Sequence, residues 1–107
     1  MKVYVITSIL VLFCFPVFAE IRTVEVLAKD GKFSPTEIEM TTQERIILVI
    51  NNQGSDAEEF ESIPLHKEKI VLPGRSISLK IGPLPKGVYH FFGDFHPETA
   101  QGNITVK

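Results

Sequence analysis

Histidine and acidic side chains gather in two short segments of the sequence, and together they could bind a metal ion. His96 and Asp94 lie in a loop between residues 93 and 102, and a run of carboxylates follows the pair Asn51-Asn52. Imidazole and carboxylate ligands suit Cu(II), Fe(II), Fe(III) or Mn(II), and without sulfur they do not favour Cu(I). The side chains available for such a site are His96, Glu59, Glu58, Asp94, Glu61 and His66.

Strand alternation limits which carboxylates can meet His96. If the acidic run is a strand, Glu58 shares one face with Phe60, whereas Glu59 and Glu61 share the other. Only one of these faces can point toward the histidine, unless a bulge intervenes. Each candidate also has a simpler interpretation, because an acidic run is commonly a solvated edge and Asp94 can be a turn former.

Other kinds of chemistry find no support in the sequence. No nucleophile–base pair with recognisable spacing and no phosphate-binding loop occur, so no catalytic residue is predicted. Residues 20–107 contain ten basic and thirteen acidic residues, which gives a formal net charge of −3 with neutral histidines. Nucleic acid is therefore not an expected partner.

The first 19 residues have the pattern of a secretory signal peptide. Lys2 supplies a positive charge, residues 3–15 are largely apolar, and Val17-Phe18-Ala19 fits a signal-peptidase site. A retained membrane anchor is the alternative, but the apolar run is short for a span. We expect cleavage after Ala19 and an exported domain of residues 20–107, which lacks cysteine because Cys14 leaves with the signal.

Residues 20–107 predict an all-β fold. Short apolar runs alternate with turn signals such as Asp30-Gly31 and Pro73-Gly74, and no long segment has helical periodicity. Residues 45–50 are apolar nearly throughout, which favours a central strand covered on both sides or at the middle of a sandwich. The spacing predicts seven or eight strands in a two-sheet Greek-key β-sandwich.

The strand and loop of residues 87–102 resemble the metal-binding end of the cupredoxins, and the resemblance covers essentially all of residues 20–107. Gly87, Tyr89 and Phe91 match the strand that precedes the ligand loop in that family, and His96 falls where the loop histidine would lie. The resemblance implies a cupredoxin-like sandwich. It also shows departures, because the family's first histidine, its cysteine and its methionine correspond to Glu58, Gly93 and a position near Thr99. A blue-copper site needs a copper–thiolate bond, so this chain cannot build one.

A narrower resemblance accounts for these departures. Residues 59–62, 91–97 and 99–102 are similar to the cysteine-less periplasmic cupredoxin-like proteins found with bacterial high-affinity iron permease systems. That resemblance implies a copper or iron ion bound by His96 and carboxylates, with Glu59 favoured by the motif and Glu58 as the geometric alternative. It also implies an accessory role in iron uptake, in metal oxidation or hand-over. The implied partners are an inner-membrane iron permease and periplasmic iron-binding proteins, and the expected state is a monomer or weak dimer.

Two other functions stay open on the sequence alone. A metal-free adhesion or assembly module would keep the sandwich without the site. A non-blue copper electron-transfer protein would keep a metal but lose the thiolate, which gives a high reorganisation cost unless the geometry is preset.

Overall fold

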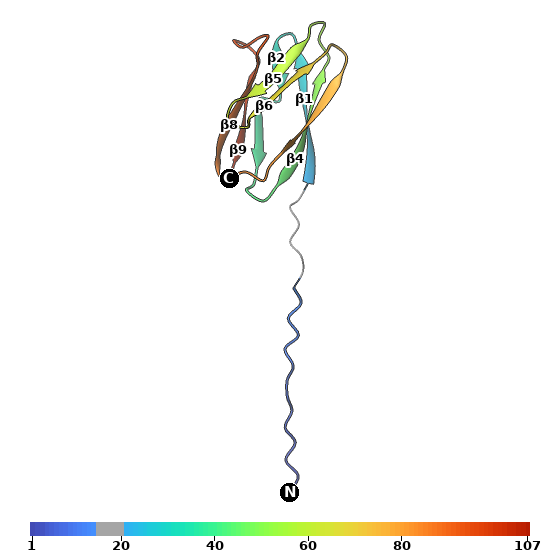
Figure 1. Cartoon of the computed structure of the whole chain (residues 1–107), viewed down its shortest axis with the longest axis vertical. Coiled ribbons are helices and arrows are strands. Elements are labelled where there is room, and N and C mark those ends of the chain that lie inside the picture. The colour runs from blue at the N-terminus through green and yellow to red at the C-terminus, as the bar shows by residue number, and fades with distance from the viewer. Residues whose placement is uncertain (15–20) are drawn as a thin grey trace.

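The computed structural model describes residues 1–14 and 21–107, and the second range forms two β-sheets packed face to face (Figure 1). Residues 1–14 contain neither helix nor strand. Across both described ranges, no helix is long and apolar enough to cross a membrane. The predicted cleavage point after Ala19 lies outside the described residues.

The first sheet contains four strands in the order β2, β1, β4 and β7. Their bounds are Lys32–Ser34 for β2, Ile21–Lys29 for β1, Arg45–Asn52 for β4 and Ser76–Ile81 for β7. The two inner strands, β1 and β4, run parallel, and their register extends from Ile21 opposite Arg45 to Ala28 opposite Asn52. This pairing brings the Asp30-Gly31 turn beside the polar loop that follows β4.

The second sheet contains five strands in the order β3, β9, β8, β5 and β6. Their bounds are Glu37–Met40 for β3, Gln101–Val106 for β9, Gly87–Gly93 for β8, Glu58–Ser62 for β5 and Lys67–Val71 for β6. Strand β5 pairs with the last two residues of β8, so that Phe60 lies opposite Gly93 and Glu61 opposite Phe92. The acidic strand therefore lies directly beside the start of the loop that carries His96.

The all-β sandwich predicted from the sequence is confirmed, with nine strands in residues 21–107 rather than seven or eight. The extra strand arises at Pro35, which lacks the N–H needed to continue a ladder. The chain changes sheets there, so β2 joins the first sheet and β3 the second.

The core forms from alternate positions of the strands. Strand β4 is central, between β1 and β7. Its buried side chains are Ile46, Leu48, Ile50 and Asn52, which alternate along the strand, so one of its faces is covered more completely than the other. Phe60 and Phe91 stack with ring centroids 5.3 Å apart. Because these rings come from β5 and β8, they fix the two strands that carry the candidate site.

Candidate functional site

Glu58 and His96 meet at the loop end of the sandwich. Glu58 begins β5 and points inward, with only 5% of its side chain exposed, whereas the His96 side chain is 33% exposed. The distance from His96 Nδ1 to Glu58 Oε2 is 2.5 Å. An imidazole from the last loop thus converges with a carboxylate from the segment after the asparagine pair, as the sequence predicts.

The Glu58 carboxylate is fully engaged by the protein. Its Oε1 accepts the backbone N–H of Phe95 at 3.0 Å and that of Glu59 at 3.1 Å, while Oε2 contacts His96. Hydrogen bonds to an ionised acceptor are stronger than those between neutral groups. These contacts offset the cost of burying a carboxylate and join β5 to a loop 37 residues further along the chain.

Gly93 leaves the space that Glu58 fills. A Cβ atom at Gly93 would lie 2.5 Å from Glu58 Cδ and 2.8 Å from Ala100 Cβ. Real Cβ atoms do not approach other atoms so closely, so a side chain here requires Glu58 to move. The Gly93 N–H donates to the Ala100 carbonyl at 2.8 Å, which closes the loop of residues 94–100 on itself.

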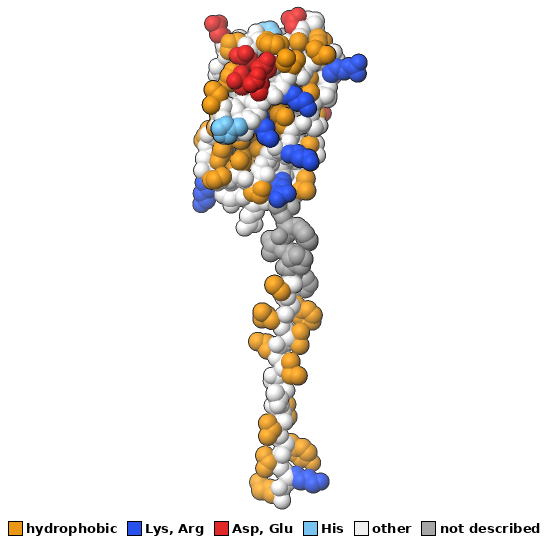
Figure 2. All heavy atoms as spheres, in the orientation of Figure 1, with side chains coloured by type: hydrophobic (Ala, Val, Ile, Leu, Met, Phe, Trp, Pro, Cys, Tyr) orange, Lys and Arg blue, Asp and Glu red, His pale blue; other side chains and the backbone are white. Residues whose placement is uncertain are grey.

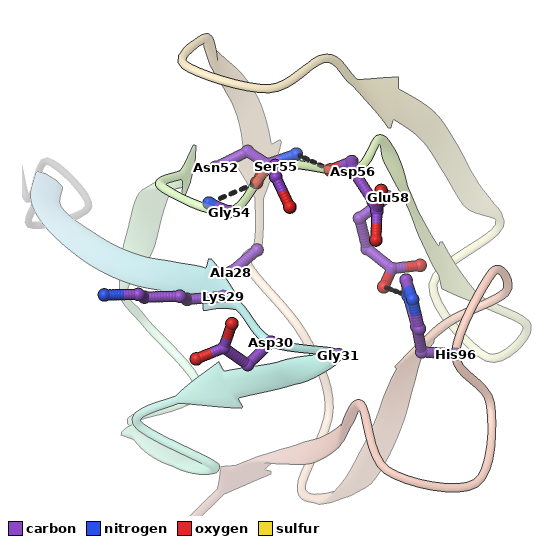
Figure 3. A pocket seen from close by; sticks show the side chains of 10 residues that line it. All are labelled: Ala28, Lys29, Asp30, Gly31, Asn52, Gly54, Ser55, Asp56, Glu58 and His96. Atoms are coloured by element: carbon purple, nitrogen blue, oxygen red, sulfur yellow. Dashed lines mark hydrogen bonds and ion pairs between the residues drawn. The ribbon is translucent and has the colours of Figure 1, made fainter.

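The Glu58–His96 pair forms one side of a small cavity of about 160 Å³ (Figure 3). Figure 3 shows the two side chains directed toward each other, with the β1–β2 turn and the loop after β4 around the remaining sides. Asn52, which is buried, holds that loop by donating to the carbonyls of Asp56 and Val71 and accepting from the Gly54 N–H. The lining residues are Ala28, Lys29, Asp30, Gly31, Asn52, Gly54, Ser55, Asp56, Glu58 and His96.

Glu59, Glu61 and Asp94 form a second group on the outer face of the five-stranded sheet. One carboxylate oxygen from each of the three lies within 4.8 Å of the others. The Asp94 N–H donates to the Glu59 carbonyl at 2.8 Å, which fixes the start of the loop against β5. Figure 2 shows acidic side chains gathered in a compact group on the surface of the sandwich. We call Glu59, Glu61 and Asp94 the outer acidic cluster.

Glu68 adds a fourth carboxyl group beside the outer acidic cluster. A side-chain hydrogen bond with Glu68 raises the pKa of Glu59, and partial desolvation and the neighbouring carboxylates raise it further. Partial desolvation raises the pKa of Glu61, with smaller contributions from the charges of Asp94 and Glu68. Among residues 1–14 and 21–107, none of these four carboxylates takes part in an ion pair with a basic side chain. The cluster therefore concentrates negative charge.

Glu68 is the residue of this region that was not predicted from the sequence as a ligand. It lies opposite Glu61 in the β5–β6 pairing. The sequence feature that could have indicated Glu68 is the β5–β6 hairpin, because residues directly opposite each other in an antiparallel pair have neighbouring side chains. The register could not be assigned until the turn length was known.

His66 lies apart from both groups. It is exposed at the turn between β5 and β6, with a left-handed φ of 54°. It lines a surface hollow together with Glu61 and Glu68, but it is not among the residues whose ligand atoms lie within 4.8 Å of one another.

The six predicted ligands thus divide into three places. Glu58 and His96 pair inside the loop end, and Glu59, Glu61 and Asp94 gather outside. His66 lies at the turn between β5 and β6, outside both groups. The alternation predicted for β5 is confirmed, since its burial pattern places Glu58 inward and Glu59 outward. Glu58, the geometric alternative, is the carboxylate that contacts His96, whereas Glu59, the ligand that the motif favours, points to the outer face.

A family model described as Cupredoxin-like domain matches residues 2–106. The Uncharacterized protein RP394 of Rickettsia prowazekii (strain Madrid E) is 48% identical over 87 residues, which cover 81% of this chain and 70% of that protein. This relative carries no assigned function, so it supports the family and nothing more specific.

Solved structures share the fold at low sequence identity. Auracyanin A, described as a blue copper protein from Chloroflexus aurantiacus, matches with a TM-score of 0.69 and 11% identity over 82% of this chain and all of that chain. A purple cupredoxin from Nitrosopumilus maritimus matches with a TM-score of 0.60 and 18% identity over 78% of this chain and 98% of that chain.

A chain from a heme-copper terminal oxidase dimer also matches, with a TM-score of 0.67 and 19% identity over 80% of this chain. The present chain spans 65% of that oxidase chain, less than two thirds. At these identities the likeness extends to the fold alone.

The residues at the loop end do not fit a blue-copper ion. Such a site takes a thiolate flanked by two imidazoles, and here Gly93 and Glu58 stand where the resemblance places the cysteine and the first histidine. The space beside Gly93 is filled by the Glu58 carboxylate. One imidazole is left, and its Nδ1 is already bonded.

Proposed function

Because the chain belongs to the cupredoxin-like domain family, we propose that it is a metal-binding protein that carries an iron or copper ion as cargo, as an accessory in iron uptake. The observation that supports this most is the outer acidic cluster, in which Glu59, Glu61 and Asp94 bring carboxylate oxygens within 4.8 Å of one another. The cargo is bound there and released to a partner.

The chemistry of the cluster favours an oxidised ion. Carboxylates are hard oxygen ligands, so they hold Fe(III) and Cu(II) in preference to the reduced ions. The fold brings like charges close together, and a bound cation would relieve their repulsion. No basic side chain in residues 1–14 and 21–107 forms an ion pair with the cluster. A multivalent cation is therefore the partner that the charge distribution suits best.

The accessibility of the cluster suits hand-over rather than storage. Glu59 and Glu61 are partly buried and Asp94 is exposed, so a bound ion would keep open positions facing solvent. An incoming ligand from another protein can occupy such positions before the ion leaves. We propose that the recipient is an inner-membrane iron permease or a periplasmic iron-binding protein, which is the setting implied by the motifs in residues 59–62 and 91–97.

The proposed location is the periplasm, reached by export and cleavage after Ala19. N-terminal sequencing of the protein recovered from the periplasmic fraction tests it, and a chain that starts at Glu20 is expected. A full-length chain found in the membrane fraction would instead support a retained anchor.

Metal titration tests the proposed function directly. The purified protein is titrated calorimetrically with Cu(II) and with Fe(III) supplied as a nitrilotriacetate complex. Removing the three carboxylates by Glu59→Gln, Glu61→Gln and Asp94→Asn is expected to weaken binding on the order of 100-fold or more, since changes in the surroundings of a ligand alone cost 10–100-fold.

A matched control removes three exposed carboxylates elsewhere, by Glu25→Gln, Glu37→Gln and Glu39→Gln. It changes the net charge equally and should keep the wild-type affinity. Equal weakening in both triple variants would reduce the effect to general electrostatic attraction. No binding by the wild type would favour the metal-free adhesion or assembly module.

A further inference from the structure

We infer that the Glu58 carboxylate is the permanent occupant of the loop end of the sandwich, and that it excludes copper there by occupying the position itself. This inference concerns a different site from the outer acidic cluster and does not depend on the proposed cargo. It assigns Glu58 and His96 to a cross-link within the protein and not to a metal site.

The first support is space. Gly93 has no side chain. If it carried a Cβ atom, that atom would lie only 2.5 Å from the carboxylate carbon of Glu58, which is too close for two carbon atoms. The corresponding distance to Oε1 is 2.6 Å. A carboxylate and a cysteine side chain therefore cannot share this end of the molecule. Glycine at position 93 and glutamate at position 58 form a complementary pair, although they are 35 residues apart in the sequence.

The second support is that both oxygens of the Glu58 carboxylate are already engaged by the protein. Glu58 accepts two backbone N–H groups with Oε1 and contacts His96 Nδ1 with Oε2. No side-chain nitrogen or oxygen that is buried in the described residues lacks a partner. A metal ion held by both His96 Nδ1 and Glu58 Oε2 would have to break the 2.5 Å contact between these two atoms.

The third support is the connection that the pair makes. A metal ion bound by two segments holds them together, and here hydrogen bonds do so, because Glu58 on β5 contacts both Phe95 and His96 in the loop. The Asp94 N–H adds a further bond to the Glu59 carbonyl, at 2.8 Å. Three successive loop residues are thus fixed to β5 without a metal.

Residual copper binding tests the inference in the protein from which the outer acidic cluster has been removed. In the background of Glu59→Gln, Glu61→Gln and Asp94→Asn, one equivalent of Cu(II) is added and the electron paramagnetic resonance spectrum is recorded. We expect the spectrum to stay the same when His96→Ala is added to this triple variant. Adding His90→Ala instead is the control, because His90 is an exposed histidine outside the loop end. An imidazole nitrogen splitting that His96→Ala abolishes and His90→Ala keeps would overturn the inference.

A gain-of-function variant gives a second readout that does not depend on the stability of His96→Ala. The double substitution Glu58→His and Gly93→Cys removes the carboxylate and supplies two imidazoles and one thiolate around the vacated space. This donor set produces intense thiolate-to-copper absorption. We expect the absorption in the double variant, but not in Gly93→Cys alone, where the Glu58 carboxylate competes with the new side chain for the same space and no second imidazole is supplied.

A position-matched control is Glu59→His with Gly93→Cys, which places the new imidazole on the opposite face of β5. Thiolate-to-copper absorption in Gly93→Cys alone, equal to that of the double variant, would show that Glu58 excludes nothing and would overturn the inference. Failure of the wild type to bind Fe(III) or Cu(II) at the outer acidic cluster would refute the proposed function and leave this inference standing.

Discussion

Removing the Glu58 carboxylate should destabilise the protein more than any other single change of a charged residue in the sandwich. In Glu58→Ala, the N–H groups of Phe95 and Glu59 and the His96 ring lose their common acceptor. A buried donor left without a partner costs about 1–3 kcal/mol. The adjacent cavity of about 160 Å³ can admit water, which satisfies part of the loss.

Because three hydrogen bonds are lost together, we expect Glu58→Ala to lower the free energy of unfolding by about 3–4 kcal/mol. Glu58→Gln should cost only about 1–2 kcal/mol, because its amide oxygen can still accept both backbone N–H groups. Since small domains are stable by roughly 5–15 kcal/mol, both variants should fold. Urea unfolding followed by circular dichroism measures the difference, with an unchanged m-value as the check on two-state behaviour. A cost below about 1 kcal/mol for Glu58→Ala would refute the structural role of the carboxylate.

Three further predictions follow from individual contacts. Gly93→Ala should lower the free energy of unfolding by about 1–3 kcal/mol through overpacking against Glu58. The same substitution should cost much less in a Glu58→Ala background, and denaturant unfolding of both single variants and the double variant measures this difference. The pKa of Glu59 is raised in the folded protein, so ionisation of this side chain destabilises the fold at any pH above the pKa that Glu59 has in the unfolded chain. With metal removed by chelator, Glu59→Gln should raise the thermal midpoint at pH 7 and lose this advantage as the pH falls below 4.5, the ordinary glutamate value. The N–H of Thr41 lowers the pKa of Glu44, so Glu44 stabilises the fold above pH 4.5 and loses that effect as the pH falls through its lowered pKa. Glu44→Gln should thus cost about 0.5–1.5 kcal/mol at pH 7, and in a pH series of denaturant melts the gap to wild type should close in acid.

Much of the arrangement around the site could be predicted because it follows from local rules. Two-residue alternation separates Glu58 from Glu59, and the order of strands brings the loop with His96 to the end of the acidic strand. These features depend on residues that are close in sequence or on the periodicity of a strand. They did not require knowledge of side-chain packing.

The choice between the two faces of β5 could not be predicted, because it depends on a residue far away in the chain. Acidic side chains are seldom fully buried, so the run at residues 56–61 is typical of a solvated edge. Glu58 is buried because Gly93 leaves space and because two backbone N–H groups point into that space. The Glu68 contribution was missed for a related reason, since it depends on the register of a hairpin.

The account places the metal ion outside the sandwich and a carboxylate inside it, and anomalous diffraction from a crystal soaked in Cu(II) or Fe(III) tests both statements at once. The predicted result is an anomalous peak in contact with Glu59, Glu61 and Asp94, with the Glu58 carboxylate still bonded to His96. A peak coordinated by His96 Nδ1, with Glu58 displaced or bound to the ion, would contradict the account.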